Sequence, residues 1–226
     1  MRIGRRMELT ATKETITNKS AIKIKKRDGR LEDLDIDKIH FVVEEACEGL
    51  AGVSSSQIEI NANIQFYDGM TTKEVQQILV RSANDLISLE APNYQYAAAR
   101  LLSYDVRKEA HGQYEYMPLL KLILRNIKAG VYDRNIVEKY NKSEIKRLNT
   151  WIKRDRDLDF TYAGLRQVVD KYLVQDRSSG DLFETPQDMY MMIAATLFAD
   201  YPAKTRMNYV KKYYDAISTF KINIPT

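Results

Sequence analysis

The sequence predicts a mainly helical α+β protein in which two small β-hairpins accompany a long series of helices. Apolar side chains recur at helical spacing through most of the chain. Turn-forming residues, Asp28-Gly29 and the run 178–181, each lie between two short apolar segments. The composition, 44% hydrophobic and 29% charged, is that of a globular protein with a packed core.

Composition excludes several classes of protein. The 226 residues are enough for one large or two ordinary domains, and a single cysteine cannot build a disulfide framework or a cysteine-based zinc site. The 35 basic and 31 acidic residues are mixed along the chain, so nucleic-acid binding is permitted but not indicated. Residues 1–20 are polar, without a signal peptide or membrane span, and we expect a flexible tail on a cytoplasmic protein.

The first hairpin is centred on Asp28-Gly29, a pair that favours a two-residue turn because both positions can take positive φ. A helix is expected to start about ten residues later. Cations beside a helix N-terminus can hold a phosphate, although a solvated basic hairpin is the simpler alternative. The basic residues of the hairpin are Lys23, Lys25, Lys26, Arg27 and Arg30.

Residues 37–50 follow as a helix, with Ile39, Val43 and Ala46 in its apolar stripe and Cys47 expected as a small buried thiol beside it. Residues 54–66 fit either a strand or a short helix, and we favour the helix. Tyr67-Asp68-Gly69 forms a turn.

Thr71-Thr72-Lys73-Glu74 then forms a capping box, with Thr72 expected to cap a third helix. Its stripe extends from Val75 to Leu89. After the break at Pro92, a helix over 93–111 ends at Gly112, and residues 21–112 form one compact unit.

The second half is also helical. Residues 155–159 alternate in charge and are predicted to be a solvated link. Segments 174–176 and 182–183 flank the second hairpin turn. Thr185 as N-cap, Pro186 at the first position and Asp188 in the first turn begin a helix so apolar that we expect it to be deeply buried. The predicted helices are 118–128, 143–153, 162–170, 186–199 and 203–218.

Little catalytic chemistry is visible. His40 and His111 lie in separate predicted helices with no partners suited to a metal. The chain has no dinucleotide-binding glycine motif, P-loop or serine nucleophile. The run 211–214 mixes lysine and tyrosine, which can mark a nucleic-acid surface, but at helical spacing it favours a core edge with solvated lysines.

A series of motifs nevertheless resembles one family. In order, the motifs are Lys26-Arg27-Asp28-Gly29 with Asp37-Lys38-Ile39, Ile64 to Gly69, Pro92 to Arg100, Tyr172 to Gln175, Glu184 to Gln187 and Ser218 to Ile222. Together they are similar to the ATP-cone and following helical region of class I ribonucleotide reductase large subunits of the bacterial and phage type. The resemblance covers nearly all of residues 21–226.

The resemblance implies an ATP-cone at 21–112 and a helical region at 113–226 that leads into a ten-stranded α/β barrel absent from this sequence. ATP or dATP, with Mg²⁺, would be the effector, and Thr226 would contact the substrate diphosphate. The family's catalytic cysteines lie in the barrel, so Cys47 is none of them, and neither catalytic residues nor metal ligands are expected here. The implied effector contacts are Lys26, Glu32, Asp33, Leu34, Asp35, Ile36, Asp37, Lys38, Thr72 and Lys108.

The implied function is therefore part of a ribonucleoside-diphosphate reductase. Its partners would be a complementary large-subunit chain carrying the barrel and a radical-generating small subunit, in an oligomer without nucleic acid or membrane. The alternative is a free-standing ATP-cone regulator, for example of transcription, although the sequence shows no helix-turn-helix or zinc-finger signature.

Two positions depart from the family. Bacterial members carry histidine where this chain has Gln76 and Asp105. An ionised Asp105 can only accept hydrogen bonds and repels a triphosphate. We therefore expect weak or absent inhibition by dATP, unless both side chains point to solvent.

Overall fold

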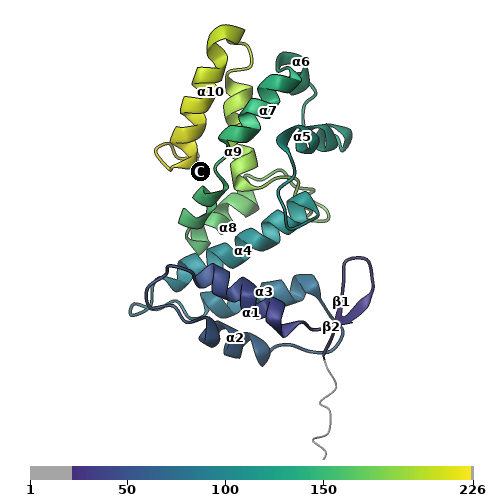
Figure 1. The fold of residues 1–226 in the computed structure, drawn as a ribbon, viewed down its shortest axis with the longest axis vertical. Coiled ribbons are helices and arrows are strands. Elements are labelled where there is room, and N and C mark those ends of the chain that lie inside the picture. Colours follow the sequence, from purple (N-terminus) through teal and green to yellow (C-terminus); the bar gives the residue numbers. More distant parts are fainter. Residues whose placement is uncertain (1–21, 225–226) are drawn as a thin grey trace, which may run out of the picture.

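The structure is a computed structural model that describes residues 22–224, so the predicted tail 1–20 and Thr226 lie outside the described residues. Most described residues are helical and a small sheet accompanies them, which confirms the predicted fold class. In Figure 1 the sheet and helices α1 to α3 occupy one end of an elongated molecule, and α5 to α7 with α10 occupy the other.

The sheet has three short strands in the order β2-β1-β3. Strands β1 (Lys23–Lys25) and β2 (Leu31–Asp33) pair antiparallel as the predicted hairpin. Strand β3 (Met70–Thr71) pairs parallel to β1 and was not predicted. Two residues are too few to show the alternation by which a strand is recognised.

The predicted two-residue turn is wrong. The backbone N–H of Lys26 donates to the carbonyl of Arg30 at 2.8 Å, so the three residues 27–29 form the loop. Of these, only Gly29 has positive φ, at +87°. A left-handed glycine at the third position is typical of three-residue hairpin loops. Asp28 instead closes the loop with its carboxylate, which accepts from the N–H of Arg30 at 3.1 Å.

Four helices complete the first part of the chain: α1 (Ile36–Cys47), α2 (Ser55–Asn63), α3 (Thr72–Asn84) and α4 (Tyr94–His111). The preference for a helix over a strand at 54–66 is confirmed. The predicted stripe of α3 was too long, because the helix ends at Asn84 and Leu89 is 97% exposed. Small side chains of α4 are fully buried, Ala97 among them, and let α3 pack closely against it.

The second part contains α5 (Leu119–Lys128), α7 (Lys142–Trp151), α8 (Tyr162–Lys171) and α10 (Ala203–Ser218), each close to its predicted range. Helix α6 (Asn135–Lys139) is one short turn that was not predicted. The second hairpin is confirmed as a bridge between Gln175 and Leu182.

The prediction of a solvated link at 155–159 is wrong for Asp157, although Asp155, Leu158 and Asp159 are exposed. Residues Arg154–Asp159 form a 3₁₀ helix, η1, and Asp157 is only 3% exposed. Helix α9 (Pro186–Leu197) is buried over its first turns, as expected, but Leu197 is 55% exposed at its end. Charge alternation occurs both in solvated segments and in segments that pack against other elements. It could not reveal that Asp157 bonds to Gln187, 30 residues away.

Helix α4 joins the two parts. It packs against α1 and α3 on one side and against α8 and η1 on the other. In Figure 1 it lies across the middle of the molecule. Gly112, with φ of +71°, ends the helix where the boundary was predicted, although the division into units at that residue stays a prediction. Among residues 22–224, no helix combines the length and apolar character needed to cross a membrane.

The assignment of the buried face of α2 can be tested with two isoleucines. Ile58 is fully buried and Ile60 is 62% exposed. We expect Ile58→Ala to lower the free energy of unfolding by about 2–5 kcal/mol because it leaves a cavity. Ile60→Ala is the control and should change it by less than about 0.5 kcal/mol. Chemical denaturation of both variants measures the difference, and equal losses would contradict the assigned face.

Candidate nucleotide-binding site

A small pocket of about 180 Å³ lies between the first hairpin, the start of α1, and helices α3 and α4. The structure brings eight of the ten predicted effector contacts to it, and leaves Ile36 and Asp37 outside the lining. Their role in binding stays a prediction. The eight lining residues are Lys26, Glu32, Asp33, Leu34, Asp35, Lys38, Thr72 and Lys108.

The pocket also has an apolar wall that was not predicted. It consists of core-facing side chains of β1, α1 and α3, and such a surface suits the flat face of a base. The helical stripes could have identified most of these residues, because they occupy stripe positions beside the predicted polar contacts. The apolar residues are Ile24, Ile39, Val42, Val75 and Leu79.

Three lysines supply the positive charge. Lys26 lies 3.2 Å from Glu32 and Lys38 lies 2.8 Å from Asp35, each pair measured between the ammonium and a carboxylate oxygen. Lys108 has no ion-pair partner among residues 22–224. Partial burial, with Arg27 and Lys26 nearby, lowers the pKa of Lys108. An anion in the pocket would relieve this repulsion between cations.

The predicted capping box is confirmed, but its cap is Thr71 and not Thr72. The Thr71 hydroxyl accepts from the N–H of Glu74 at 3.2 Å, and the Glu74 carboxylate accepts from the N–H of Thr71 at 2.7 Å. The spacing Thr-x-x-Glu fits only the first threonine. Thr72 is thus the first helical residue of α3 and lies in the pocket.

The two departures from the family are both half-buried. Gln76 lines the pocket, and its side-chain amide donates to the carbonyl of Leu101 at 2.8 Å, which ties α3 to α4. Asp105 lies among charged neighbours of both signs. Burial and the nearby Glu109 raise its pKa, while Lys73 and other cations act in the opposite direction. Neither side chain points freely to solvent.

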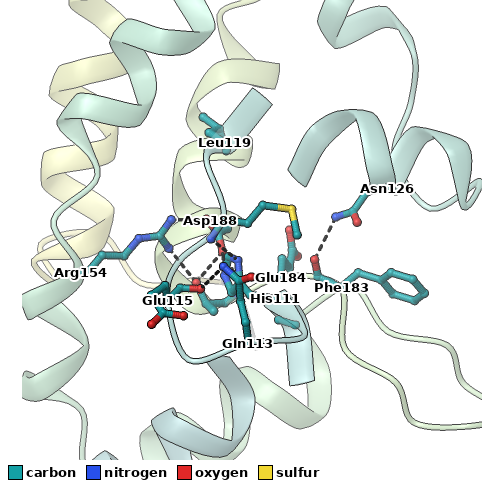
Figure 2. Close-up of polar contacts among 12 residues, drawn as sticks. His111, Gln113, Glu115, Leu119, Asn126, Arg154, Phe183, Glu184 and Asp188 are labelled. Atoms are coloured by element: carbon teal, nitrogen blue, oxygen red, sulfur yellow. Dashed lines mark hydrogen bonds and ion pairs between the residues drawn. The ribbon is translucent and has the colours of Figure 1, made fainter. Parts of the chain in front are cut away.

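A second polar cluster is buried where α4 meets α9 (Figure 2). His111 Nε2 lies 3.0 Å from Asp188, and the Arg154 guanidinium lies 2.6 Å from the other oxygen of that carboxylate. The side chains of His111 and Asp188 are fully buried. Because His111 Nδ1 accepts from the N–H of Met117 at 3.0 Å, the proton is assigned to Nε2, which donates to Asp188.

The charge in this cluster is compensated. Burial alone would raise the pKa of Asp188, but Arg154 and the bond from His111 hold it well below its usual range. Asp188 also closes a capping box, accepting from the N–H of Thr185 at 3.1 Å. The cluster around His111 was not predicted, and its partner Asp188 lies 77 residues away in the sequence. Within residues 22–224, no group of His, Cys, Asp and Glu side chains is suited to a metal ion.

Two further acids are buried nearby. Asp157 accepts from the Gln187 side-chain amide at 2.8 Å through one oxygen, and its other oxygen has no partner. Burial raises the pKa of Asp157 to about 7. Burial likewise raises the pKa of Glu184 to about 7, although its carboxylate accepts from the Tyr132 hydroxyl and from the N–H of Val174.

Comparison with known proteins finds two family matches along the chain. Residues 22–109 match the family model of the ATP cone domain, and residues 158–226 match that of the ribonucleotide reductase all-alpha domain. The chain is similar to the ribonucleoside-diphosphate reductase 1 subunit alpha of Escherichia coli strain K12, with 46% identity over 203 residues. That alignment covers 90% of this chain and 27% of the relative.

Two other relatives give the same picture. The ribonucleoside-diphosphate reductase subunit alpha of Haemophilus influenzae is 42% identical over 92% of this chain and 28% of its own length. The subunit alpha of Enterobacteria phage T4 is 40% identical over 91% of this chain and 27% of its own. The chain thus spans little more than a quarter of the relatives it matches.

The buried acid Asp157 is expected to make the stability of the fold depend on pH. An acid with a raised pKa in the folded state stabilises the fold most while protonated, so the contribution is lost as the pH rises from 3.8 to about 7. Asp157→Asn cannot ionise. Between pH 4 and pH 8, the free energy of unfolding of this variant should fall by less than that of the parent. The difference between the two falls should be up to about 4 kcal/mol.

Denaturation curves at several pH values measure this difference. The exposed neighbour Asp155 provides the control, since Asp155→Asn should follow the parent. Parallel curves for parent and Asp157→Asn would show that the buried carboxyl does not titrate in this range.

Proposed function

Because the chain belongs to the family of ribonucleotide reductase large subunits and carries an ATP cone ahead of the all-alpha domain, we propose that residues 21–112 bind ATP or dATP as an allosteric effector. The observation that carries the proposal is the pocket in which Lys26, Lys38 and Lys108 surround an apolar wall. Cations favour a polyphosphate and the apolar wall favours a base. Mg²⁺ would accompany the nucleotide.

The remaining part of the proposal concerns the whole enzyme. Residues 113–226 would pack on a complementary chain that carries the catalytic barrel, and a small subunit would supply the radical. The one cysteine of this chain supports the assignment of the chemistry to the other chains. Cys47 is half-buried in α1, and burial raises the pKa of its thiol to about 11, so it is no ready thiolate. Reduction of ribonucleoside diphosphates, in an oligomer in the cytoplasm without nucleic acid or membrane, would thus require the other chains.

The alternative of a free-standing cone regulator has no specific observation in its favour. The match of residues 158–226 to the ribonucleotide reductase all-alpha domain favours the reductase. A regulator would need a separate element that contacts DNA or a partner, whereas the helices after the cone pack on α4 as part of one continuous core.

The effector site can be tested by charge removal. Lys26→Ala or Lys108→Ala removes a charge-assisted hydrogen bond to phosphate worth about 1.5–3 kcal/mol, so the affinity for ATP should fall about ten-fold or more. Calorimetric titration of the 226-residue chain measures this. Lys121→Ala is the control, because Lys121 is exposed on α5 and lies outside the pocket. Unchanged affinity in both pocket variants would mean that neither lysine contacts the nucleotide and that the basic hairpin is only a solvated surface.

Regulation gives a second test. Asp105 places a carboxylate beside Lys73, Arg27 and Lys108, where it opposes an incoming triphosphate. We expect the enzyme reconstituted with barrel chain and small subunit to show weak or absent inhibition by dATP.

Gln76→His together with Asp105→His should strengthen that inhibition. Activity across a dATP titration, with ATP as competitor, is the measurement. Strong inhibition of the parent enzyme at low dATP would contradict the argument, and so would a double variant that responds like the parent.

A further inference from the structure

A larger groove of about 640 Å³ lies beside the effector pocket, between the two parts of the chain. The first hairpin and the start of α3 form one wall, with Lys25, Arg27 and Lys73. Arg125 of α5 and Asp181 of the second hairpin lie on the opposite side. The groove is therefore built from residues that are far apart in the sequence and belong to both family units or the segment between them.

The lining of the groove is positively charged. Five cations, Lys25, Lys26, Arg27, Lys73 and Arg125, face two carboxylates, Glu109 and Asp181, which leaves an excess of three positive charges. Only part of this charge is neutralised locally. Lys73 pairs with Glu109 at 3.2 Å, whereas neither Lys25 nor Arg27 has a carboxylate partner among the described residues 22–224.

Among these cations, Arg125 is the strongest indication of an anion site, because it is half-buried and its hydrogen bonds go only to neutral oxygens. Its guanidinium donates to the carbonyl of Ala110 at 2.6 Å, to the carbonyl of Phe183 at 2.8 Å, and twice to the side-chain oxygen of Asn126. These four bonds leave one of its five N–H groups available. A partly desolvated cation that forms no ion pair among residues 22–224 favours an anion beside it.

The groove adjoins the effector pocket. Lys26 and Thr72 line both cavities, so a chain of phosphates that starts in the pocket can extend into the groove. The first turn of α3 begins at this junction, and its helix dipole adds positive potential. The charge, the shape and the connection to the pocket all suit a phosphate group.

We propose that this groove is a phosphate-binding site, in which a phosphate group lies between Arg27 and Lys73 of the cone and Arg125 of the helical part. One source of the phosphate is the terminal phosphate of the nucleotide in the adjoining pocket. For this source the proposal rests on the proposed function. The other source is a separate inorganic polyphosphate. From either source, the bound phosphate links the cone to α5, so occupancy of the groove holds the two parts together.

Calorimetric titration of the 226-residue chain with ATP, ADP and inorganic tripolyphosphate tests the site. The variants are Arg27→Gln and Lys73→Gln, with Lys204→Gln, exposed on α10, as the matched control. If the nucleotide supplies the phosphate, ATP affinity falls about ten-fold in both variants and ADP affinity is unchanged. If a separate polyphosphate supplies it, tripolyphosphate binds the ATP-saturated parent, and both variants weaken that binding about ten-fold.

Glu109→Gln should change the binding affinity in the opposite direction. It removes the carboxylate that pairs with Lys73 and should tighten the same binding event, an effect that damage to the fold would not produce. The proposal is overturned if Arg27→Gln and Lys73→Gln bind ATP and tripolyphosphate as tightly as the parent, or if the parent binds neither. If the parent binds tripolyphosphate but not ATP, the groove proposal stands and the effector proposal is refuted. Failure of the groove proposal and failure of the effector proposal can therefore be told apart.

Discussion

The buried contact between His111 and Asp188 is the interaction on which the arrangement of the two parts depends. It joins the last residue of α4 to the first turn of α9, and Arg154 of η1 completes the neutralisation of the carboxylate. A buried carboxylate that lost either partner would be an uncompensated charge, which is strongly destabilising. The three elements are therefore held in one relative position by a group that cannot be left unpaired.

Helix α4 extends this constraint to the effector pocket. Lys108 lies three residues before His111, so the lysine and the buried histidine share the last turn of the same helix. The carbonyl of Ala110, between them in the sequence, is bound by Arg125 of α5. The end of α4 is thus fixed by α5 and α9, while its exposed edge carries a cation of the pocket. If a nucleotide binds as proposed, a rigid helix end of this kind would give its phosphate a fixed position relative to the helical part.

Much of the fold could be predicted from local patterns, because the relevant signals lie within a few residues of each other. The box at Thr71 and Glu74, and the Thr185-Pro186 start of α9, are examples in which cap and helix are adjacent in sequence. The elements that were missed depend on distant partners. Strand β3 exists only because β1 lies beside it, and Asp157 in the charged run of η1 is buried because α4 and α9 pack against that segment.

The candidate site could be predicted from the sequence only in part, and from different signals than the fold. Periodicity located the apolar wall without identifying it as part of a pocket, whereas the resemblance named the polar residues that line the pocket. Neither could place Asp105 beside Lys73 and Arg27, because that group of charges is assembled from the hairpin, α3 and α4. The same reason hid Arg125, whose sequence neighbours are ordinary helix-forming residues. A half-buried guanidinium is recognised only when its acceptors are known, and here they lie on α4, the second hairpin and its own helix. Local sequence therefore determines which residues are charged, and the packing of distant elements determines which of those charges remain available for a ligand.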